Sequence, residues 1–459
     1  MLFHNADLPR ALKAFVNAHP EYKEIPMEDW DVSGVESMAG WFEDFADDLL
    51  PSLEKWDTSN VKDMSYMFSG FQGRLPEGVR DWDVSNVTNM RGIFYQSSIE
   101  FLYLDRWDTS NVKNMREAFS YCWRTRTIDV GNWDTSSVTD MSYMFRGCTS
   151  LTEMEINDWD VSKVKSMHGM FESCGGLKKL DISKWSWRSA EDAAYMFRFC
   201  QKITEIDLGD TVAPKLTNMC HMFHACHWLE KITMALCTEN VFDMSYLFSH
   251  CYFLKRINIT SFNTKKVDDM SHMFSYCERL KEVDLSRFDT SNVRNMEEMF
   301  NECMALEQLD LSNFNTSKVL LFNDMFNNCR KLKKLDISSF NTSKATTMFA
   351  MFKDCRALLE LDVSNFDTRK VTNFSFMFCG CDSIVRLDMG SFYIQQGAST
   401  LGMCTDCLSL SELVQPKKHK EVTLGAGSFG FCSSLPKKYV YWSDDDSEED
   451  EDDFRLFTH

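Results

Sequence analysis

The sequence contains few of the residues that break regular structure, with 8 proline and 19 glycine residues among 459. This composition excludes a collagen-like chain and a chain dominated by flexible linkers. No run of about 18 apolar residues occurs, so we expect no transmembrane helix. The first residues show no charged segment followed by an apolar one, so no secretory signal is expected. The net charge of −20 has the wrong sign for neutralising phosphates, which argues against a nucleic-acid partner.

Methionine, phenylalanine and cysteine are abundant by contrast, at 28, 36 and 17 residues, and one repeat accounts for all three. The segment WDTSNVKDMSYMF recurs along the chain, and each copy begins at an anchor position that is usually aromatic. The anchors follow one another every 26 residues, with 25 at two steps: Trp30, Trp56, Trp82, Trp107, Trp133, Trp159, Trp185, the degenerate Thr211 and Leu236, then Phe262, Phe288, Phe314, Phe340, Phe366 and Phe392. Such a period predicts one elongated solenoid domain, here with about fifteen coils.

A single copy, residues 288–312, predicts the structure of each coil. Its apolar residues after the first turn recur at three- and four-residue steps, which predicts a helix of about ten residues: Val293, Met296, Met299, Phe300 and Cys303. Leu309 and Leu311 flank Asp310, which predicts a very short parallel strand with the aspartate facing outward. Because strands stack more closely than helices, we expect a curved, leucine-rich-repeat-like α/β solenoid with its strands on the concave side.

Composition changes along the chain divide it into four parts. We expect an N-terminal helical cap at 1–29, the repeat solenoid at 30–410, a frayed repeat or cap at 411–442, and a disordered acidic tail at 443–459. The tail carries nine acidic residues in SDDDSEEDEDD. Ser443 and Ser447 are each followed by three acids and resemble sites of acidophilic kinases. The tail either shields the chain and keeps it soluble or is a regulated interaction segment.

The copies FDTSNVRNMEEMFNECMALEQLDLSNFNTSKV and FNTSKATTMFAMFKDCRALLELDVSNFDTRKV closely resemble the repeat of BspA-like leucine-rich-repeat surface proteins. The resemblance covers about four fifths of the chain, and its motif recurs in register. It implies a leucine-rich-repeat-like solenoid that is used for binding, often at microbial cell surfaces, and that has no catalytic activity. The sequence departs from the pattern of the surface proteins, because we expect in it no signal peptide, no lipidation cysteine near its start and no wall-anchoring tail.

Most cysteines occupy one repeat position and form a ladder: Cys122, Cys148, Cys174, Cys200, Cys226, Cys251, Cys277, Cys303, Cys329, Cys355, Cys381 and Cys407. Phe45 and Phe71 occupy the same position in early copies, which indicates a buried filling position. Identical side chains in register point the same way, so we expect reduced thiols and not disulfides. An odd total of cysteines and the missing signal predict a reducing, intracellular compartment, with the cell surface as the alternative.

Two clusters could hold a metal, although we expect no cofactor. Cys379, Cys381, Cys404 and Cys407 lie about one repeat apart in C-G-C and C-T-D-C and are weak candidates for zinc ligands. The segment CHMFHACHW contains Cys220, Cys226 and three histidines, His221, His224 and His227. Tyrosine occupies the His221 position in other copies, so a partly exposed ring is the simpler interpretation of this histidine.

The strand aspartates form an outward column that is a candidate binding stripe: Asp181, Asp207, Asp284, Asp310, Asp336, Asp362 and Asp388. Three interpretations remain open for this column. It is a solvated face whose aspartates pair with neighbouring lysine and arginine residues, a stripe that binds a basic partner segment, or a calcium site. The D-T-S-N segments, as in residues 57–60, have the composition of a turn and helix cap, and the Asn315 and Asn341 sequons belong to this turn.

These observations favour an intracellular, non-catalytic protein–protein interaction scaffold, with no nucleic-acid partner and no membrane span. We expect it to bind an unidentified protein through its concave face. The irregular copies between residues 181 and 250 are either a binding site or tolerated drift. The alternatives are a cell-surface, adhesin-type binding protein and a metal-binding protein that uses Cys379, Cys381, Cys404 and Cys407.

Overall fold

The computed structural model describes residues 27–45, 52–210, 212–420, 422, 424 and 427–436. The chain divides into two compact units, the first ending at Val293 and the second beginning at Arg294. Residues 1–26 of the expected N-terminal cap, the acidic tail with Ser443 and Ser447, and the degenerate anchor Thr211 lie outside the described residues. So do residues 421, 423, 425, 426 and 437–442 of the expected C-terminal cap region. The four domain boundaries therefore stay predictions.

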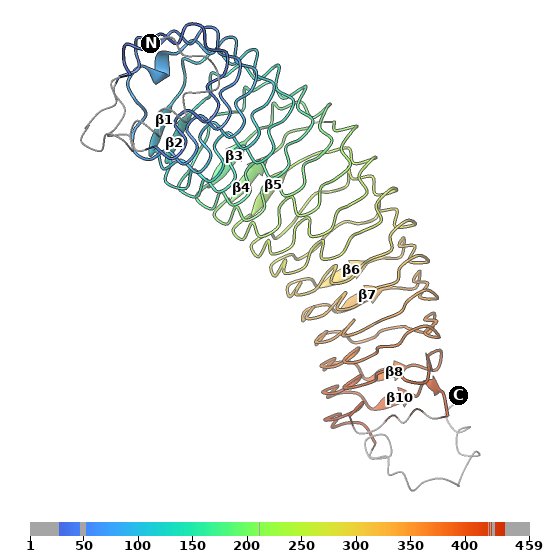
Figure 1. Cartoon of the computed structure of the whole chain (residues 1–459). Coiled ribbons are helices and arrows are strands. Elements are labelled where there is room, and N and C mark those ends of the chain that lie inside the picture. Colours follow the sequence, from blue (N-terminus) through green and yellow to red (C-terminus); the bar gives the residue numbers. More distant parts are fainter. Residues whose placement is uncertain are drawn as a thin grey trace. The chain divides into compact units, whose positions relative to one another are not determined.

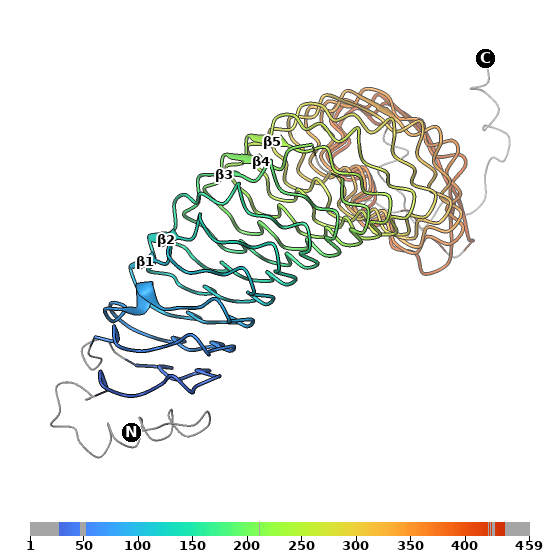
Figure 2. The same cartoon turned by 90° about the horizontal axis from the view of Figure 1, so that it is seen from above.

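Within the described residues, the first unit contains one short helical turn and five strands. The 3-10 turn η2 spans Val79–Asp81, and the strands are β1 (Phe101–Tyr103), β2 (Thr127–Asp129), β3 (Lys179–Asp181), β4 (Glu205–Asp207) and β5 (Lys231–Thr233). Strand β1 pairs with β2, and β3, β4 and β5 form a three-stranded sheet. Every pairing is parallel, and partners lie one repeat apart, as in Leu180 opposite Ile206. Strands β3, β4 and β5 lie side by side in successive coils (Figures 1 and 2).

The described part of the second unit contains six strands of the same kind. They are β6 (Gln308–Asp310), β7 (Lys334–Asp336), β8 (Arg386–Asp388), β9 (Tyr393–Ile394), β10 (Glu412–Val414) and β11 (Lys417–Lys418). Parallel pairs join β6 to β7, β8 to β10 and β9 to β11. The predicted very short strand is therefore confirmed, with Leu309 buried and Asp310 exposed in β6.

Single-residue parallel bridges on another side of the coils link each turn to the next. Examples are Asp140 with Ser166 in the first unit and Asn295 with Leu321 in the second. The described chain is a parallel β-solenoid of about twelve turns, and the predicted count of fifteen coils is not supported.

The predicted helix of about ten residues in each coil is wrong. Among the described residues, η2 is the only helical segment, and the stretch after each D-T-S-N turn consists of tight turns. In residues 296–303 the N–H groups alternate between two kinds of partner. The Met299 N–H donates to the Met296 carbonyl three residues back, whereas the Glu298 N–H donates to Asn323 in the next coil. A helix would direct all these N–H groups within its own coil.

Two residues in each coil explain why no helix forms. Glu298 and Glu302 have φ angles of 53° and 60°, the left-handed region that interrupts a right-handed helix. The same two positions are left-handed in coil after coil, and several copies place glycine there, as at Gly92 and Gly147. The three- and four-residue spacing survives because these turns also direct every third or fourth side chain inward. All five apolar residues that the spacing selected in 288–312 are buried.

Stacks of identical side chains fill the core of each unit. In the first unit ten phenylalanine rings, from Phe42 to Phe274, follow one another with centroids 5.3–5.7 Å apart. In the second unit the same position stacks Phe300, Phe326, Phe352 and Phe378 at 5.5–5.8 Å. Anchor tryptophans stack beside them, as Trp107 does on Trp133 at 6.2 Å. Each coil thus covers the apolar edge of its neighbour, which is how a repeat array becomes stable.

Candidate functional site

The binding surface predicted from the sequence lies on the strands. We call it the strand face and define it as the first and third residues of strands β1 to β8 and β10. These residues are exposed or half-buried, while the middle residue points into the core. In the first unit Lys179, Glu205 and Lys231 lie in successive coils. The Lys179 ammonium is 3.5 Å from the Glu205 carboxylate, which also bonds Lys231. The exposed charges of this face therefore pair along the solenoid.

The aspartate column belongs to the strand face but has a structural role. Each carboxylate accepts a hydrogen bond from the N–H two residues later at 2.9–3.0 Å: Asp181, Asp207, Asp284, Asp310, Asp336, Asp362 and Asp388. Hydrogen bonds from Ser183 lower the pKa of Asp181, and those from Ser364 do the same for Asp362. These carboxylates hold the turn that follows each strand. The expected diagonal pairing between strands is not seen among the described ion pairs: Arg386 pairs with Asp388 of its own strand, β8, at 3.5 Å.

The D-T-S-N segments connect three coils. Asp57 accepts a hydrogen bond from the Ser59 N–H, which fixes the turn. The buried Thr58 hydroxyl donates to the Asp83 carbonyl in the next coil, and the Asn60 amide donates to the Ser33 carbonyl in the previous one. The turn interpretation therefore holds, and the helix-cap part is wrong because no helix follows. Asn315 and Asn341, the sequon residues, hold turns in the same way.

The ladder cysteines line the core as free thiols. Each thiol for which a bond is described donates to a phenylalanine carbonyl of the previous coil, as Cys148 does to Phe119 at 3.2 Å and Cys355 to Phe326 at 3.2 Å. Burial raises the pKa of Cys122, Cys174 and Cys277 to about 12. A thiol that stays protonated reacts slowly, because the thiolate is the nucleophile.

We expect native protein to show about two quickly reacting thiols. Fifteen of the seventeen free cysteines are buried, and Cys237 and Cys379 are half-buried. Titration with a chromogenic disulfide reagent should therefore give a small fast phase, and the remaining thiols should appear only after denaturation. Fewer than seventeen thiols in denaturant would show disulfides and contradict the ladder.

The zinc candidates do not converge. Cys381 and Cys407 donate to phenylalanine carbonyls, while Cys379 accepts a hydrogen bond from Thr405, and the Cys404 carbonyl accepts one from Cys432. Over the part of the chain that the structure describes, no group of three or more His, Cys, Asp or Glu side chains is arranged to hold a metal ion.

The histidine cluster belongs to an aromatic ladder that sequence reasoning missed. Six alternating tyrosine and histidine rings follow one another at 4.1–5.1 Å: Tyr143, His168, Tyr195, His221, Tyr246 and His272. The ring of His224 packs edge-on against His221 at 5.2 Å. Five of these rings share one repeat position, which the sequence showed, whereas His168 lies one residue earlier in its copy, next to Gly169. The sequence did not show that the six rings stack.

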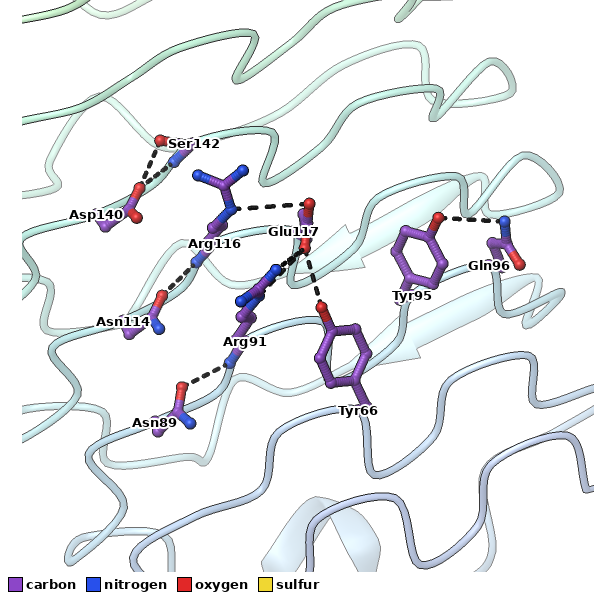
Figure 3. Close-up of polar contacts among 10 residues, drawn as sticks. All are labelled: Tyr66, Asn89, Arg91, Tyr95, Gln96, Asn114, Arg116, Glu117, Asp140 and Ser142. Atoms are coloured by element: carbon purple, nitrogen blue, oxygen red, sulfur yellow. Dashed lines mark hydrogen bonds and ion pairs between the residues drawn. The ribbon is translucent and has the colours of Figure 1, made fainter.

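Arginine clamps border this ladder on the same surface. Glu117 accepts a hydrogen bond from the Tyr66 hydroxyl at 3.1 Å and pairs with both Arg91 and Arg116, at 3.2 and 3.7 Å (Figure 3). The buried Glu172 likewise holds Arg146 at 2.9 Å and Arg198 at 3.4 Å. Because each carboxylate is shared by two guanidinium groups, these clamps brace neighbouring coils.

The histidines predict a loss of stability in acid. Burial, together with a smaller contribution from nearby cationic groups, lowers the pKa of His221 to about 4 and the pKa of His224 to about 3. Because the unfolded pKa is about 6.5, the neutral rings stabilise the fold fully above that pH. This stability is lost as the pH falls towards 4 and 3. Allowing for partial exposure, we expect the pair to remove about 2–3 kcal/mol of the free energy of unfolding between pH 7 and 4.

Urea unfolding at pH 7, 6, 5 and 4 measures this effect. The variant H221Y/H224S introduces residues that the chain itself uses at these positions, as at Tyr195 and Ser249. Its stability should fall less steeply with acid than that of the unchanged protein. Equal slopes for the two proteins would show that these histidines do not govern acid lability.

The irregular copies between residues 181 and 250 do not interrupt the stack. The bridges from Asp192 to Asn218 and from Asn218 to Asp243 continue through them. Leu236, which replaces the aromatic anchor, is buried, and so is Trp187. An open hollow lies at Pro214, lined by Lys215, Lys266 and neighbouring polar residues.

Comparison with known sequences identifies a repeat family. A sequence model of the family described as "Mycoplasma protein of unknown function, DUF285" matches residues 10–124, 114–233, 202–309, 277–388 and 302–416. These overlapping matches run through most of the chain, so a repeat family is confirmed, whereas the finer BspA-like assignment stays a prediction. A search of curated proteins finds no match.

Several solved structures of leucine-rich-repeat proteins match parts of this chain at low TM-scores. An internalin from Listeria monocytogenes is 12% identical, with 71% of this chain and 83% of that one covered and a TM-score of 0.24. A leucine-rich cell surface protein from Faecalibacterium prausnitzii is 16% identical, covering 71% and 78%, with a TM-score of 0.29. A leucine-rich-repeat protein from Bacteroides ovatus is 14% identical, covering 86% and 83%, with a TM-score of 0.32. At such low identities and TM-scores, neither partner nor activity is carried over from these proteins.

Membrane-spanning segments were also considered. Within the described ranges, no helix has the length and apolar character needed to cross a bilayer.

Proposed function

The chain belongs to the DUF285 family, and from this premise we propose that it is a non-catalytic scaffold that binds protein partners through its strand face. The main support for the proposal is that some groups of the strand face are held by contacts within the protein, whereas others are exposed to solvent. The aspartate column and the strand backbone are engaged within the protein, whereas side chains such as Lys179 and Arg386 remain exposed at one per coil. A periodic row of side chains on a rigid backbone is the surface that repeat proteins use for binding.

Reversing the charge pattern of the face tests this proposal. The variant K179E/E205K/K231E keeps the alternation of signs, so the ion pairs within the face can still form. A partner, however, meets the opposite charge at every position. We expect proteins recovered with the unchanged chain from its own cells to bind this variant about tenfold more weakly or worse, measured by quantitative mass spectrometry.

A matched control exchanges a pair outside the strand face. Lys62 and Glu36 form an exposed ion pair at 3.0 Å, and K62E/E36K keeps that pair with its charges exchanged. Its set of partners should be unchanged. Partners that are lost equally from both variants, or from neither, would contradict binding through the face formed by β3, β4 and β5.

The intracellular location is part of the same proposal. Folding a chain with seventeen unpaired thiols requires conditions in which thiols do not pair at random, which a reducing compartment provides. Glycan attached at Asn315 or Asn341 in protein from its own cells would favour the surface-adhesin alternative instead.

A further inference from the structure

In a regular repeat, a strand of the preceding coil would pair with β1. In this chain β1 is instead the first strand of its sheet. One repeat earlier, the residues aligned with Phe101–Tyr103 are Pro76, Glu77 and Gly78, because the step from Trp82 to Trp107 is 25 residues. Proline has no N–H to donate to a strand neighbour, and the left-handed Gly78, with φ of 90°, turns the chain into η2. Among the described residues, β1 therefore pairs with β2 alone, and no backbone hydrogen bond reaches its other edge.

A hollow of about 610 Å³ adjoins this free edge. Its floor is apolar and includes Leu75, Pro76 and Ile99. Phe101 and Tyr103 stand beside it as parallel rings with centroids 6.4 Å apart, 45% and 50% exposed. Both outward positions are aromatic in β1, whereas β3 and β4 carry Lys179, Asp181, Glu205 and Asp207 there.

Cationic groups outnumber carboxylates around the hollow. Arg74, Arg80 and Arg124 line it together with Glu77 and Glu100, in a chain whose net charge is −20. Arg80 is paired with Asp105, and Glu100 is paired with Arg126 at 3.2 Å. Arg124 lies 5.5 Å from the Trp123 ring, and no carboxylate of the described residues is within ion-pair distance of it. An acidic side chain of a bound peptide would pair with Arg124.

We propose that the free edge of β1 and the adjoining hollow bind an extended peptide segment of a partner protein, in which acidic residues alternate with apolar ones. The segment adds a parallel or antiparallel strand to β1, a common mode of peptide recognition. Its apolar side chain enters the hollow over Leu75 and Ile99, and an acidic neighbour faces Arg124. This inference rests on the proposed scaffold function and locates one binding position within it.

Two segments of the chain itself, aligned in the repeat, supply an acidic and a basic probe peptide of equal length. The blocked peptide of residues 357–365, ALLELDVSN, places Glu360 and Asp362 on either side of Leu361. The peptide of residues 331–339, KLKKLDISS, is of equal length but replaces the first acid by Lys334. We expect the fluorescently labelled acidic peptide to bind the full chain, measured by anisotropy, and the basic one to bind about tenfold more weakly.

Variants of the chain locate the site. R124A and F101S/Y103S should each weaken binding of the acidic peptide about tenfold. R279A is the control for the arginine, because Arg279 lies 3.8 Å from the Phe253 ring elsewhere in the same unit. F242S is the control for the aromatic pair, because Phe242 is 48% exposed. Neither control should change the affinity.

Backbone pairing is tested separately from side-chain contacts. N-methylation of alternate peptide amides should abolish binding in one of the two registers and spare it in the other, because alternate N–H groups face the strand neighbour. Equal loss in both registers would overturn strand addition, and no binding of the acidic peptide would overturn the inference as a whole. Loss of cellular partners from K179E/E205K/K231E judges the scaffold function independently of either result.

Discussion

Replacing Phe171 by alanine is expected to lower the free energy of unfolding by about 3–5 kcal/mol. Its ring is buried and lies between Phe145 and Phe197, with centroids 5.6 and 5.5 Å away and interplanar angles of 9° and 3°. Deleting it leaves a cavity bounded by two coils that cannot close, because their backbones are fixed by bonds such as those from Phe145 to Met170 and Phe171 to Met196. Urea unfolding of purified protein measures the loss.

The position of Phe171 within the stack adds a second expectation. In a repeat array, contacts between neighbouring coils provide much of the stability. When one of these interfaces is weakened, the coils on its two sides can unfold separately. We expect F171A to broaden the urea transition as well as to shift it. Y103A, which removes a half-exposed ring from the strand face, should change stability by less than about 0.5 kcal/mol. An F171A loss as small as that of Y103A would show that the phenylalanine stack does not hold the coils together.

The buried residues of the fold could be predicted from the sequence, but not their conformation. The spacing of Val293, Met296, Met299 and Phe300 correctly selects side chains that share one side of the chain. Such spacing cannot distinguish a helix from successive tight turns, since both return to the same side after three or four residues. Glycine at Gly40, Gly92 and Gly169, all aligned with Glu298, was the available sign that the position is left-handed.

The candidate site was predictable only as a surface. Repetition placed the aspartate column on the strands, but the hydrogen bond from Ser183 to Asp181 depends on a turn that follows the strand. Nor could spacing identify the hollow beside β1, which exists because Pro76 and Gly78 divert one coil. Departures from a repeat are visible in the sequence, whereas the space that they leave depends on how the neighbouring coils stack.

Gly209→Ala should destabilise the first unit by about 3 kcal/mol, which combines a backbone strain of about 1–2 kcal/mol with a steric clash. Gly209 has a φ of 69° and follows β4, where its N–H donates to Asp207. A Cβ atom there would lie 2.3 Å from the Ser183 carbonyl oxygen and 2.9 Å from the Ser183 Cα. These atoms belong to the backbone of the previous coil, so no side-chain rotation can relieve the contact.

Two other glycines distinguish the backbone strain from the steric clash. Gly397 has a φ of 78° but open space around its Cβ position, so Gly397→Ala should carry only the backbone strain, about 1–2 kcal/mol. Gly34 has neither a positive φ nor a neighbour within 4 Å, so Gly34→Ala should leave stability unchanged or raise it slightly. Urea unfolding should therefore show the largest loss of stability for Gly209→Ala, a smaller loss for Gly397→Ala and no loss for Gly34→Ala. Backbone strain is common to Gly209→Ala and Gly397→Ala, so the difference between their stability losses measures how closely adjacent coils approach after β4. A difference near zero would mean that the coils can move apart there without a loss of stability.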